Sequence, residues 1–371
     1  MSESSALTDA LTATRLDDLR AWMARQNLDA AYITRPVSIA YLTGVRAEPF
    51  ERLMALAVKG DQATLILPAI ERENAERAMS DADIMSWRDG DDPYRLVHQA
   101  LRGVVRLGVE KEHLTLAAAE TLRELVDPHE MLDAGPEIKR LRRTKSPIEV
   151  EELAHAAAIT DAATMEILGR LRGGQSELEV AVALGAAIGS AGGTLAFETI
   201  VLSGPNSALP HGHPSGRRLE AGDIVLLDFG AAYNGYRADT TRVAVVGEPD
   251  ERLREIHRIV LAAHHAAIAA VTAGATTGAV DSAAREVIDA AGLGDRFFHR
   301  VGHGLGLEAH EDPSLDPGST TMLEVGMVFT VEPGVYIPGW GGIRIEDDVV
   351  VETDGCRLLT SADRSLRVVR G

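Results

Sequence analysis

The sequence contains a single cysteine, Cys356, and few aromatic residues, which make up 4% of the chain. A disulfide bond within the chain is therefore excluded, and so is a zinc site built from a cluster of cysteines. Hydrophobic residues still account for 45% of the chain, the ordinary share for a globular protein. The core must accordingly be built mainly from Ala, Val, Leu and Ile.

Basic residues are also scarce, because 37 Lys and Arg residues stand against 56 Asp and Glu residues, and the net charge is −19. Nucleic acids and anionic membranes bind basic surfaces, so this balance argues against both as partners. No run of about 18 apolar residues suggests a membrane span. The polar stretch 1–13 lacks the basic start and apolar core of a secretory signal. We therefore expect the protein in the cytoplasm.

With 371 residues, the chain is longer than one hydrophobic core usually serves, which favours two domains. The first, expected at 1–143, alternates helical spacing with short apolar runs and is predicted to be an α/β domain. The boundary is placed in a basic stretch without apolar periodicity, Ile138–Lys145. The strands predicted in this domain are Ala30–Ile33, Leu56–Val58, Leu65–Leu67 and Val105–Val109.

The second domain, expected at 144–371, begins with a strong helix signal. Ser146 is a good N-cap, Pro147 occupies the first helical position, and Glu149 completes a capping box. Alanine-rich helices are predicted at 147–172, 176–191, 250–273 and 277–291. Strands are predicted at Thr199–Leu202, Ile224–Phe229, Thr241–Val246, Met327–Val331 and Val349–Val351. This arrangement favours an α+β domain with a mainly antiparallel sheet.

Two aspartates flank a predicted β-hairpin. Asn234-Gly235 between β-prone runs predicts a tight turn. With this turn, Asp228 and Asp239 are diagonal neighbours on one face, with backbones roughly 7–8 Å apart, and such carboxylates can bind metal ions about 3.5–4 Å apart. The alternative is a pair of surface aspartates near a turn. Against it, Asp228 follows the apolar run 224–227, where an unpaired buried carboxylate is costly.

Two histidines, His303 and His310, lie in the glycine-rich segment GHGLGLEAHEDP at 302–313. The glycines allow the backbone to approach a ligand closely. Their spacing is GxGxG and no strand-then-helix pattern surrounds them, so a nucleotide-binding loop is rejected. Because glycines and acids flank both imidazoles, we interpret them as candidate site residues.

Two glutamates stand symmetrically about Pro338–Gly342, the expected connection between two strands: Glu332 in TVEPGVY and Glu346 in GIRIEDD. If these strands pair, the glutamates oppose each other, and like charges facing each other across a sheet are destabilising. A metal ion between them would remove the repulsion. Arg344, on the same face as Glu346, offers the alternative of a plain ion-pair cluster.

These residues together supply four carboxylates and at least one imidazole, without a thiolate. Such a ligand set suits Mn, Co, Fe or Zn in a binuclear site. A water bridging the metals would be acidified to hydroxide near neutral pH, the metals would polarise a carbonyl, and further imidazoles could stabilise the oxyanion. The residues therefore predict a hydrolase that uses two divalent metal ions to cleave an amide bond.

Over nearly its whole length the chain resembles the metal-dependent pita-bread peptidases, the family of proline dipeptidases, aminopeptidase P, methionine aminopeptidase and creatinase. IAYLTG at 39–44 is similar to the creatinase/prolidase N-terminal domain. The segments DFG, GYRADTTR, GHGLGLEAHEDP, TVEPGVY and GIRIEDDV occur in the family's order. The resemblance implies an α/β N-terminal domain at 1–143 and an α+β pita-bread catalytic domain with a binuclear metal site at 144–371.

The resemblance also implies a ligand set. Asp228 is expected to chelate one metal ion, and Asp239 and Glu346 to bridge both. His303 and Glu332 are expected to complete the shell of the other ion. Glu332 is, in addition, the expected acid/base for the bridging water.

Other residues are expected on the substrate side. His211, in ALPHG at 208–212, is expected to contact the substrate, and His310 to stabilise the tetrahedral intermediate. Several prolidases carry an arginine directly after the HExP proline, suited to hold a dipeptide's terminal carboxylate, but this chain has Ser314 there. Arg242 and Arg344 are candidates to replace it, and Arg344 is predicted to bind the substrate.

The expected function is therefore that of a prolidase or an aminopeptidase P, hydrolysing the Xaa-Pro bond of dipeptides or short peptides through a metal-bridging hydroxide. The cofactors are expected to be two divalent ions, Mn first, with Co or Zn as alternatives. The N-terminal domain is expected to form a homodimer and to limit substrate size. Two alternatives stay open: a hydrolase of a non-peptide amide such as ectoine, and a non-catalytic pita-bread binding module, which would have lost metal ligands.

Overall fold

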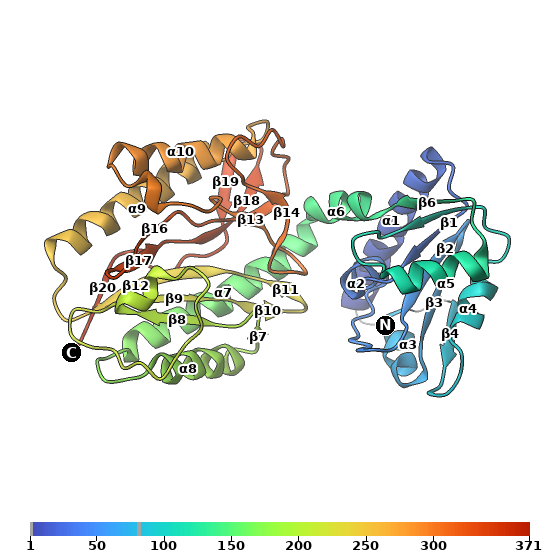
Figure 1. Ribbon diagram of the computed structural model, residues 1–371, viewed down its shortest axis with the longest axis horizontal. Helices are drawn as coiled ribbons and strands as arrows, with labels where there is room; N and C mark the ends of the chain where they lie inside the picture. The colour runs from blue at the N-terminus through green and yellow to red at the C-terminus, as the bar shows by residue number, and fades with distance from the viewer. Residues whose placement is uncertain (1–2, 80–82) are drawn as a thin grey trace. The chain divides into compact units, whose positions relative to one another are not determined.

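The computed structural model describes residues 3–79 and 83–371. The chain divides into two compact units, Met1–Arg142 and Arg143–Gly371 (Figure 1). No helix in the described part of the chain is long and apolar enough to cross a membrane.

The N-terminal unit is built on a mixed six-stranded sheet with the strand order β4-β3-β2-β1-β5-β6. Its strands are β1 (Ala30–Ile33), β2 (Ala55–Lys59), β3 (Gln62–Pro68), β4 (Asp83–Trp87), β5 (Arg106–Val109) and β6 (Glu130–Asp133). Its helices are α1 (Glu3–Arg25), α2 (Pro36–Thr43), η1 (Ala69–Glu71), α3 (Arg72–Ala78), α4 (Tyr94–Ala100), α5 (Leu116–Val126) and α6 (Gly135–Arg143). Val97 of α4 and Leu122 of α5 share one buried cluster with Leu107 of β5.

The predicted α/β class and the strands β1, β2, β3 and β5 are confirmed, but β4 and β6 were not predicted. These are the edge strands, and most of their side chains are partly or fully exposed, so they carry little hydrophobic signal. Most of the basic stretch Ile138–Lys145, which has no apolar periodicity in the sequence, is helical and belongs to α6. Ile138 and Arg142 face inward there, and a buried arginine does not register as an apolar position.

The helices of the C-terminal unit follow the prediction closely. They are α7 (Pro147–Arg170), α8 (Glu177–Ser190), α9 (Glu251–Ala270) and α10 (Thr277–Ala290), with the short helices η2 (Gly204–Ala208) and η3 (Gly294–Arg296). The capping box of Ser146 and Glu149 is present, and Ser176 and Glu179 form a second one at the start of α8. Both boxes satisfy backbone N–H groups that a helix start leaves unpaired.

The strands of this unit are mainly antiparallel, as predicted, with β12 and β20 as a parallel exception. They form the sheets β11-β10-β7, β20-β12-β9-β8 and β14-β13-β15-β18-β19 and the hairpin β16-β17. The bounds are β7 (Thr194–Leu195), β8 (Ile200–Ser203), β9 (Ile224–Phe229), β10 (Ala231–Tyr233), β11 (Tyr236–Arg237), β12 (Thr240–Val246), β13 (His303–Gly304), β14 (Glu311–Ser314), β15 (Val328–Val331), β16 (Gly334–Ile337), β17 (Gly341–Arg344), β18 (Asp347–Glu352), β19 (Gly355–Leu358) and β20 (Arg367–Val369).

Helices cover the strands from two sides, with α7 and α8 on one side and α9 and α10 on the other (Figure 1). Val225 and Leu227 of β9 belong to the buried cluster that includes Leu184 of α8. Ile224 belongs instead to the cluster that includes Val260 of α9. Because side chains alternate along a strand, Asp228 points to the same side as Ile224, away from α7 and α8.

Candidate active site

The hairpin after β9 sets the positions of two aspartates. Asn234 (φ 45°) and Gly235 (φ 76°) form the turn with left-handed backbone angles, which is the geometry that an Asn-Gly hairpin requires. The strands beside the turn and the strands β9 and β12 share one register, in which Thr241 pairs with Asp228. The predicted register is therefore confirmed, and it places Asp228 and Asp239 on one face.

The hairpin β16-β17 sets the positions of two glutamates. Its pairing continues past the named strands, because the Ile345 N–H donates to the Pro333 carbonyl, and this brings Glu332 opposite Glu346. The connection is shorter than the predicted Pro338–Gly342, since the last glycines of that stretch already pair within β17. The two carboxylates are close enough that the charge of Glu332 raises the pKa of Glu346, which burial alone already raises.

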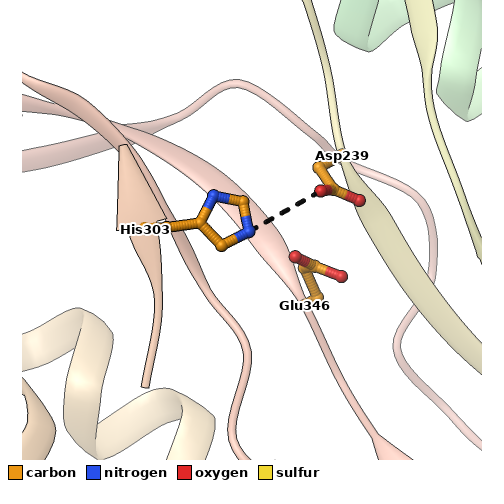
Figure 2. A group of neighbouring side chains, drawn as sticks. All are labelled: Asp239, His303 and Glu346. Carbon is orange, nitrogen blue, oxygen red and sulfur yellow. Dashed lines mark ion pairs between the residues drawn. The ribbon is translucent and has the colours of Figure 1, made fainter. Parts of the chain in front are cut away.

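Asp239, His303 and Glu346 form the centre of the site. Each offers one ligand atom, and these atoms lie within 4.8 Å of one another. Figure 2 shows the imidazole of His303 facing both carboxylates, with its Nε2 atom 3.9 Å from Oδ2 of Asp239. All three residues are buried, although they come from separate parts of the chain: Asp239 directly precedes β12, His303 lies in β13, and Glu346 lies in the link between β17 and β18.

The electrostatics of this cluster fit a bound cation. Burial raises the pKa of Asp239 and Glu346 well above the usual range, and neighbouring carboxylates raise both further. Oδ1 of Asp239 is buried without a hydrogen-bond partner among the described residues. Burial lowers the pKa of His303, so its imidazole is neutral and able to act as a ligand. Since buried carboxylates are stable only when paired, divalent ions bound by these oxygen and nitrogen atoms would relieve the repulsion.

The other predicted ligands, Asp228 and Glu332, flank this cluster. Oε1 of Glu332 lies 3.3 Å from Nε2 of His303 and accepts a hydrogen bond from Thr330 at 3.1 Å. Asp228 forms an ion pair with Arg344. The charges of both Asp228 and Glu332 contribute to the raised pKa of Asp239. The structure therefore brings all the predicted ligands to one place, with three of them in direct convergence.

Arg344 is buried, and each of its guanidinium nitrogens has a protein partner. Nε donates to Thr241 at 2.9 Å, Nη1 donates to the Tyr336 hydroxyl at 2.8 Å, and Nη2 pairs with Asp228. The ion-pair alternative considered for Arg344 is thus observed, although with Asp228 as its partner. Its predicted role in substrate binding stays a prediction, which this set of partners weighs against.

Arg242, the other candidate for substrate binding, lies in a buried network behind the site. Because side chains alternate along β12, it faces away from Asp239. Its Nη2 atom donates to Asp347 at 2.8 Å. The same carboxylate binds His264 at 2.9 Å, accepts a hydrogen bond from Thr360 and pairs with Arg364. Arg242 is therefore part of the support of the fold.

The predicted substrate-side histidines lie close to the cluster and are both exposed. The ring of His310 is 4.2 Å from the ring of His303, measured between centroids. Desolvation lowers the pKa of His310 to about 4, with further lowering by His303 and Arg300. His211 follows η2, and its charge contributes to lowering the pKa of Asp228 and of His310.

His299 and Tyr336, which were not predicted as site residues, border the same site. Nε2 of His299 lies 3.1 Å from the Tyr336 hydroxyl, which accepts a hydrogen bond from Arg344. Burial lowers the pKa of His299, and the charge of Glu332 opposes this by raising it. The available signals were weak: His299 precedes His303 by four positions beside two phenylalanines, and Tyr336 ends the segment TVEPGVY that contains Glu332.

Glu177, at the start of α8, was also missed, and it holds the segment that carries His211. Its side chain is fully buried. Oε1 accepts hydrogen bonds from the backbone and hydroxyl of Ser203, at 2.7 and 2.8 Å, and from Asn206 at 3.2 Å. Oε2 accepts from the backbone and hydroxyl of Ser215, at 3.0 and 2.6 Å. One carboxylate therefore ties together both ends of the His211 segment.

Comparison with known families agrees with this geometry. Residues 15–144 match the Creatinase/Prolidase N-terminal domain, and residues 151–353 match metallopeptidase family M24. The chain belongs to metallopeptidase family M24. The predicted family, and the predicted fold of an α/β creatinase-type domain followed by a pita-bread domain, are both confirmed.

Relatives of this M24 protein include both types of proline-specific peptidase. An Xaa-Pro dipeptidase from Lactobacillus helveticus is 36% identical over 362 residues, covering 95% of this chain and 98% of the relative. The structure of an Xaa-Pro dipeptidase from Bacillus anthracis matches with a TM-score of 0.91 at 35% identity, covering 96% of this chain and 100% of that one. An X-Pro aminopeptidase from Thermotoga maritima matches with a TM-score of 0.88 at 33% identity, covering 95% and 99%. Overall similarity therefore does not separate a dipeptidase from an aminopeptidase.

Proposed function

We propose that this M24 metallopeptidase is a two-metal Xaa-Pro peptidase that hydrolyses the bond before proline in dipeptides or short peptides. The observation that carries the proposal is the buried convergence of Asp239, His303 and Glu346, with Asp228 and Glu332 beside it. Its oxygen and nitrogen donors suit two divalent ions, of which we propose Mn, with Co or Zn as alternatives. The proline-specific relatives support the choice of substrate. A homodimer in the cytoplasm stays a prediction from the sequence.

The residues around the cluster can divide the work of amide hydrolysis. Ions held by the acids and His303 would acidify a water molecule and polarise the scissile carbonyl. Burial alone would raise the pKa of Glu332, but interactions with His303, His299, Arg344 and Thr330 together lower it, so the carboxylate is ionised and able to accept a proton. His310, neutral at pH 7, can donate an N–H to the developing oxyanion. His211 is assigned to substrate contact.

The test is hydrolysis of an Xaa-Pro dipeptide and an Xaa-Pro tripeptide by Mn-loaded and by chelator-stripped protein. We expect cleavage that depends on Mn and is lost with the chelator. The faster substrate decides between dipeptidase and aminopeptidase. Failure to cleave either peptide while two ions are bound would overturn the proposal and point to a non-peptide amide such as ectoine.

His310→Ala is expected to lower turnover by about 10²- to 10³-fold, the usual effect of removing one donor to an oxyanion. Metal content should survive, because the centre of the cluster does not include His310. The measurements are kcat and the metal content by elemental analysis. His213→Ala is the matched control, since His213 is an exposed histidine whose side chain pairs with Glu198. Unchanged turnover would remove His310 from the catalytic residues.

Glu177→Gln is expected to lower kcat/KM by roughly 10-fold, because a glutamine amide cannot accept hydrogen bonds at both ends as the carboxylate does. The His211 segment would lose its anchor at Ser215, whereas the metal content should not change. Glu179→Gln is the control. It removes a negative charge from the same helix turn but keeps an acceptor for the capping box. A loss of bound metal in Glu177→Gln would show instead that Glu177 supports the metal centre itself.

A further inference from the structure

Arg300 stands out among the arginines around the candidate site. Its side chain is half-buried, and Nη1 donates a hydrogen bond to the Ser314 hydroxyl at 2.8 Å. Within the part of the chain that the structure describes, no carboxylate forms an ion pair with Arg300. By contrast, Arg344 and Arg242 are paired with Asp228 and Asp347. A partly desolvated guanidinium without an anionic partner is conspicuous in a chain with a net charge of −19.

The backbone holds Arg300 beside the metal cluster. Leu315 accepts from the Val301 N–H at 3.3 Å, and the Leu315 N–H donates to Gly302 at 3.0 Å. Next to these bonds, Ser314 of β14 pairs with His303 of β13. Arg300 therefore rests on a hydroxyl that lies directly across the strand pair from a proposed metal ligand. Because the neighbouring residues are paired in this way, the backbone of Arg300 has little freedom to move.

The charge of Arg300 reaches the candidate site. After desolvation, which is the main cause, its positive charge contributes to the lowered pKa of both His303 and His310. The side chain therefore acts on the metal-ligating histidine and on the histidine proposed to contact the reacting carbonyl. An anionic group of a substrate bound beside these histidines would be attracted by the positive charge of Arg300.

We propose that Arg300, supported by Ser314, binds the terminal carboxylate of a dipeptide substrate and makes this protein a dipeptidase. The inference rests on the proposed function. A guanidinium presents donors in a planar fork that matches a carboxylate with two parallel hydrogen bonds. Ser314 uses Nη1, and no partner of Nε or Nη2 is observed among the described residues. In a longer peptide the carboxylate would lie at least one residue, about 3.3–3.6 Å, further along the chain.

Among the other cations near the site, Arg237 is the strongest rival. It is half-buried, and its Nε donates to the Leu307 carbonyl at 3.1 Å, in the loop that leads to His310. The charge of Arg300 is among the main causes that lower the pKa of His303 and of His310, and the charge of Arg237 is not. Arg237 is therefore included in the test as the competing assignment.

The experiment compares an Xaa-Pro dipeptide with the same dipeptide amidated at its C-terminus, using Mn-loaded parent protein and variants. The parent should prefer the free acid by about 10- to 100-fold in kcat/KM, the range expected for a hydrogen bond to a charged group. Arg300→Met should abolish this preference while metal content and hydrolysis of the amide persist. Arg300→Lys should keep part of the preference, because it keeps the charge without the fork. Arg296→Met, an exposed arginine of η3, should leave the preference unchanged.

A second readout does not depend on turnover. Calorimetric titration with L-proline and with L-prolinamide should show that the parent favours the carboxylate and that Arg300→Met does not. If neither peptide is cleaved, the proposed function fails, and the titration alone decides the role of Arg300. The role of Arg300 is overturned if the parent does not discriminate between acid and amide, if Arg300→Met still does, or if Arg237→Met removes the preference instead.

Discussion

Asp239→Ala should abolish peptide hydrolysis and reduce the metal content well below two ions per chain. Asp239 is proposed, together with Glu346, to bridge both ions, and its carboxylate is buried within 4.8 Å of the ligand atoms of His303 and Glu346. No neighbouring side chain can take over two bridging bonds from a fixed backbone. Elemental analysis together with the dipeptide assay checks the expectation, and metal content near two ions per chain would contradict the assignment.

The loss should not arise from unfolding. In metal-free protein the Asp239 carboxylate is repelled by Glu346 and Asp228, and its Oδ1 atom has no hydrogen-bond partner among the described residues. Its removal should therefore leave the metal-free protein at least as stable as the parent, since buried charge without a partner is unfavourable. Only the increase in melting temperature on adding Mn should disappear. Asp354→Asn, an exposed aspartate between β18 and β19, is the control and should change neither quantity.

Asp347→Ala should have the largest effect on stability, a loss of about 3–5 kcal/mol, as is typical when one member of a buried ion pair is removed. Burial opposes ionisation of Asp347, but hydrogen bonds and charges from His264, Arg242 and Arg364 hold its pKa far below the usual range. Without this carboxylate, Arg242 would keep its charge in an enclosed position with backbone carbonyls and Thr240 as its remaining partners.

Urea unfolding of the metal-free protein, followed by circular dichroism, measures this effect without a contribution from metal binding. That choice matters because Asp347 directly follows the proposed ligand Glu346. Asp347→Asn should be less harmful, since an amide still accepts hydrogen bonds but gives up the charge. A loss below about 1 kcal/mol in Asp347→Ala would show that the network rearranges around Arg242, in contrast to the usual cost of an unpaired buried charge.

The positions of the carboxylates were predictable because local rules set them. Asn234-Gly235 accepts left-handed backbone angles, and that turn alone determines which residues of β9 and β12 face each other. The same logic placed Glu332 opposite Glu346 across β16-β17. The helices α7 and α8 were equally accessible, since each begins with a serine cap and a capping box. Short-range signals of this kind do not depend on partners that are distant in the sequence.

The missed features depend on partners far away in the chain. Glu177 looks like an ordinary first-turn acid, which is favourable at a helix N-terminus on its own. Its importance comes from Ser203 and Ser215, and no spacing rule connects these residues to it. Arg344 was correctly placed next to the glutamates, but its ion pair with Asp228 crosses between two hairpins. The exposed edge strands β4 and β6 lacked the hydrophobic contrast by which strands are found.

The distribution of the ligands along the chain also orders the events of biosynthesis. Asp239 enters the polypeptide long before His303, and Glu346 is added later still. The bridge between Thr241 and Glu346 can form only when both segments exist and the sheets have docked. A nascent chain that has reached only β12 therefore offers Asp228 and Asp239 alone, which is too few donors to retain a divalent ion. Binding of the proposed ions would therefore have to follow translation of most of the catalytic unit, and a chain that stops early should not retain them.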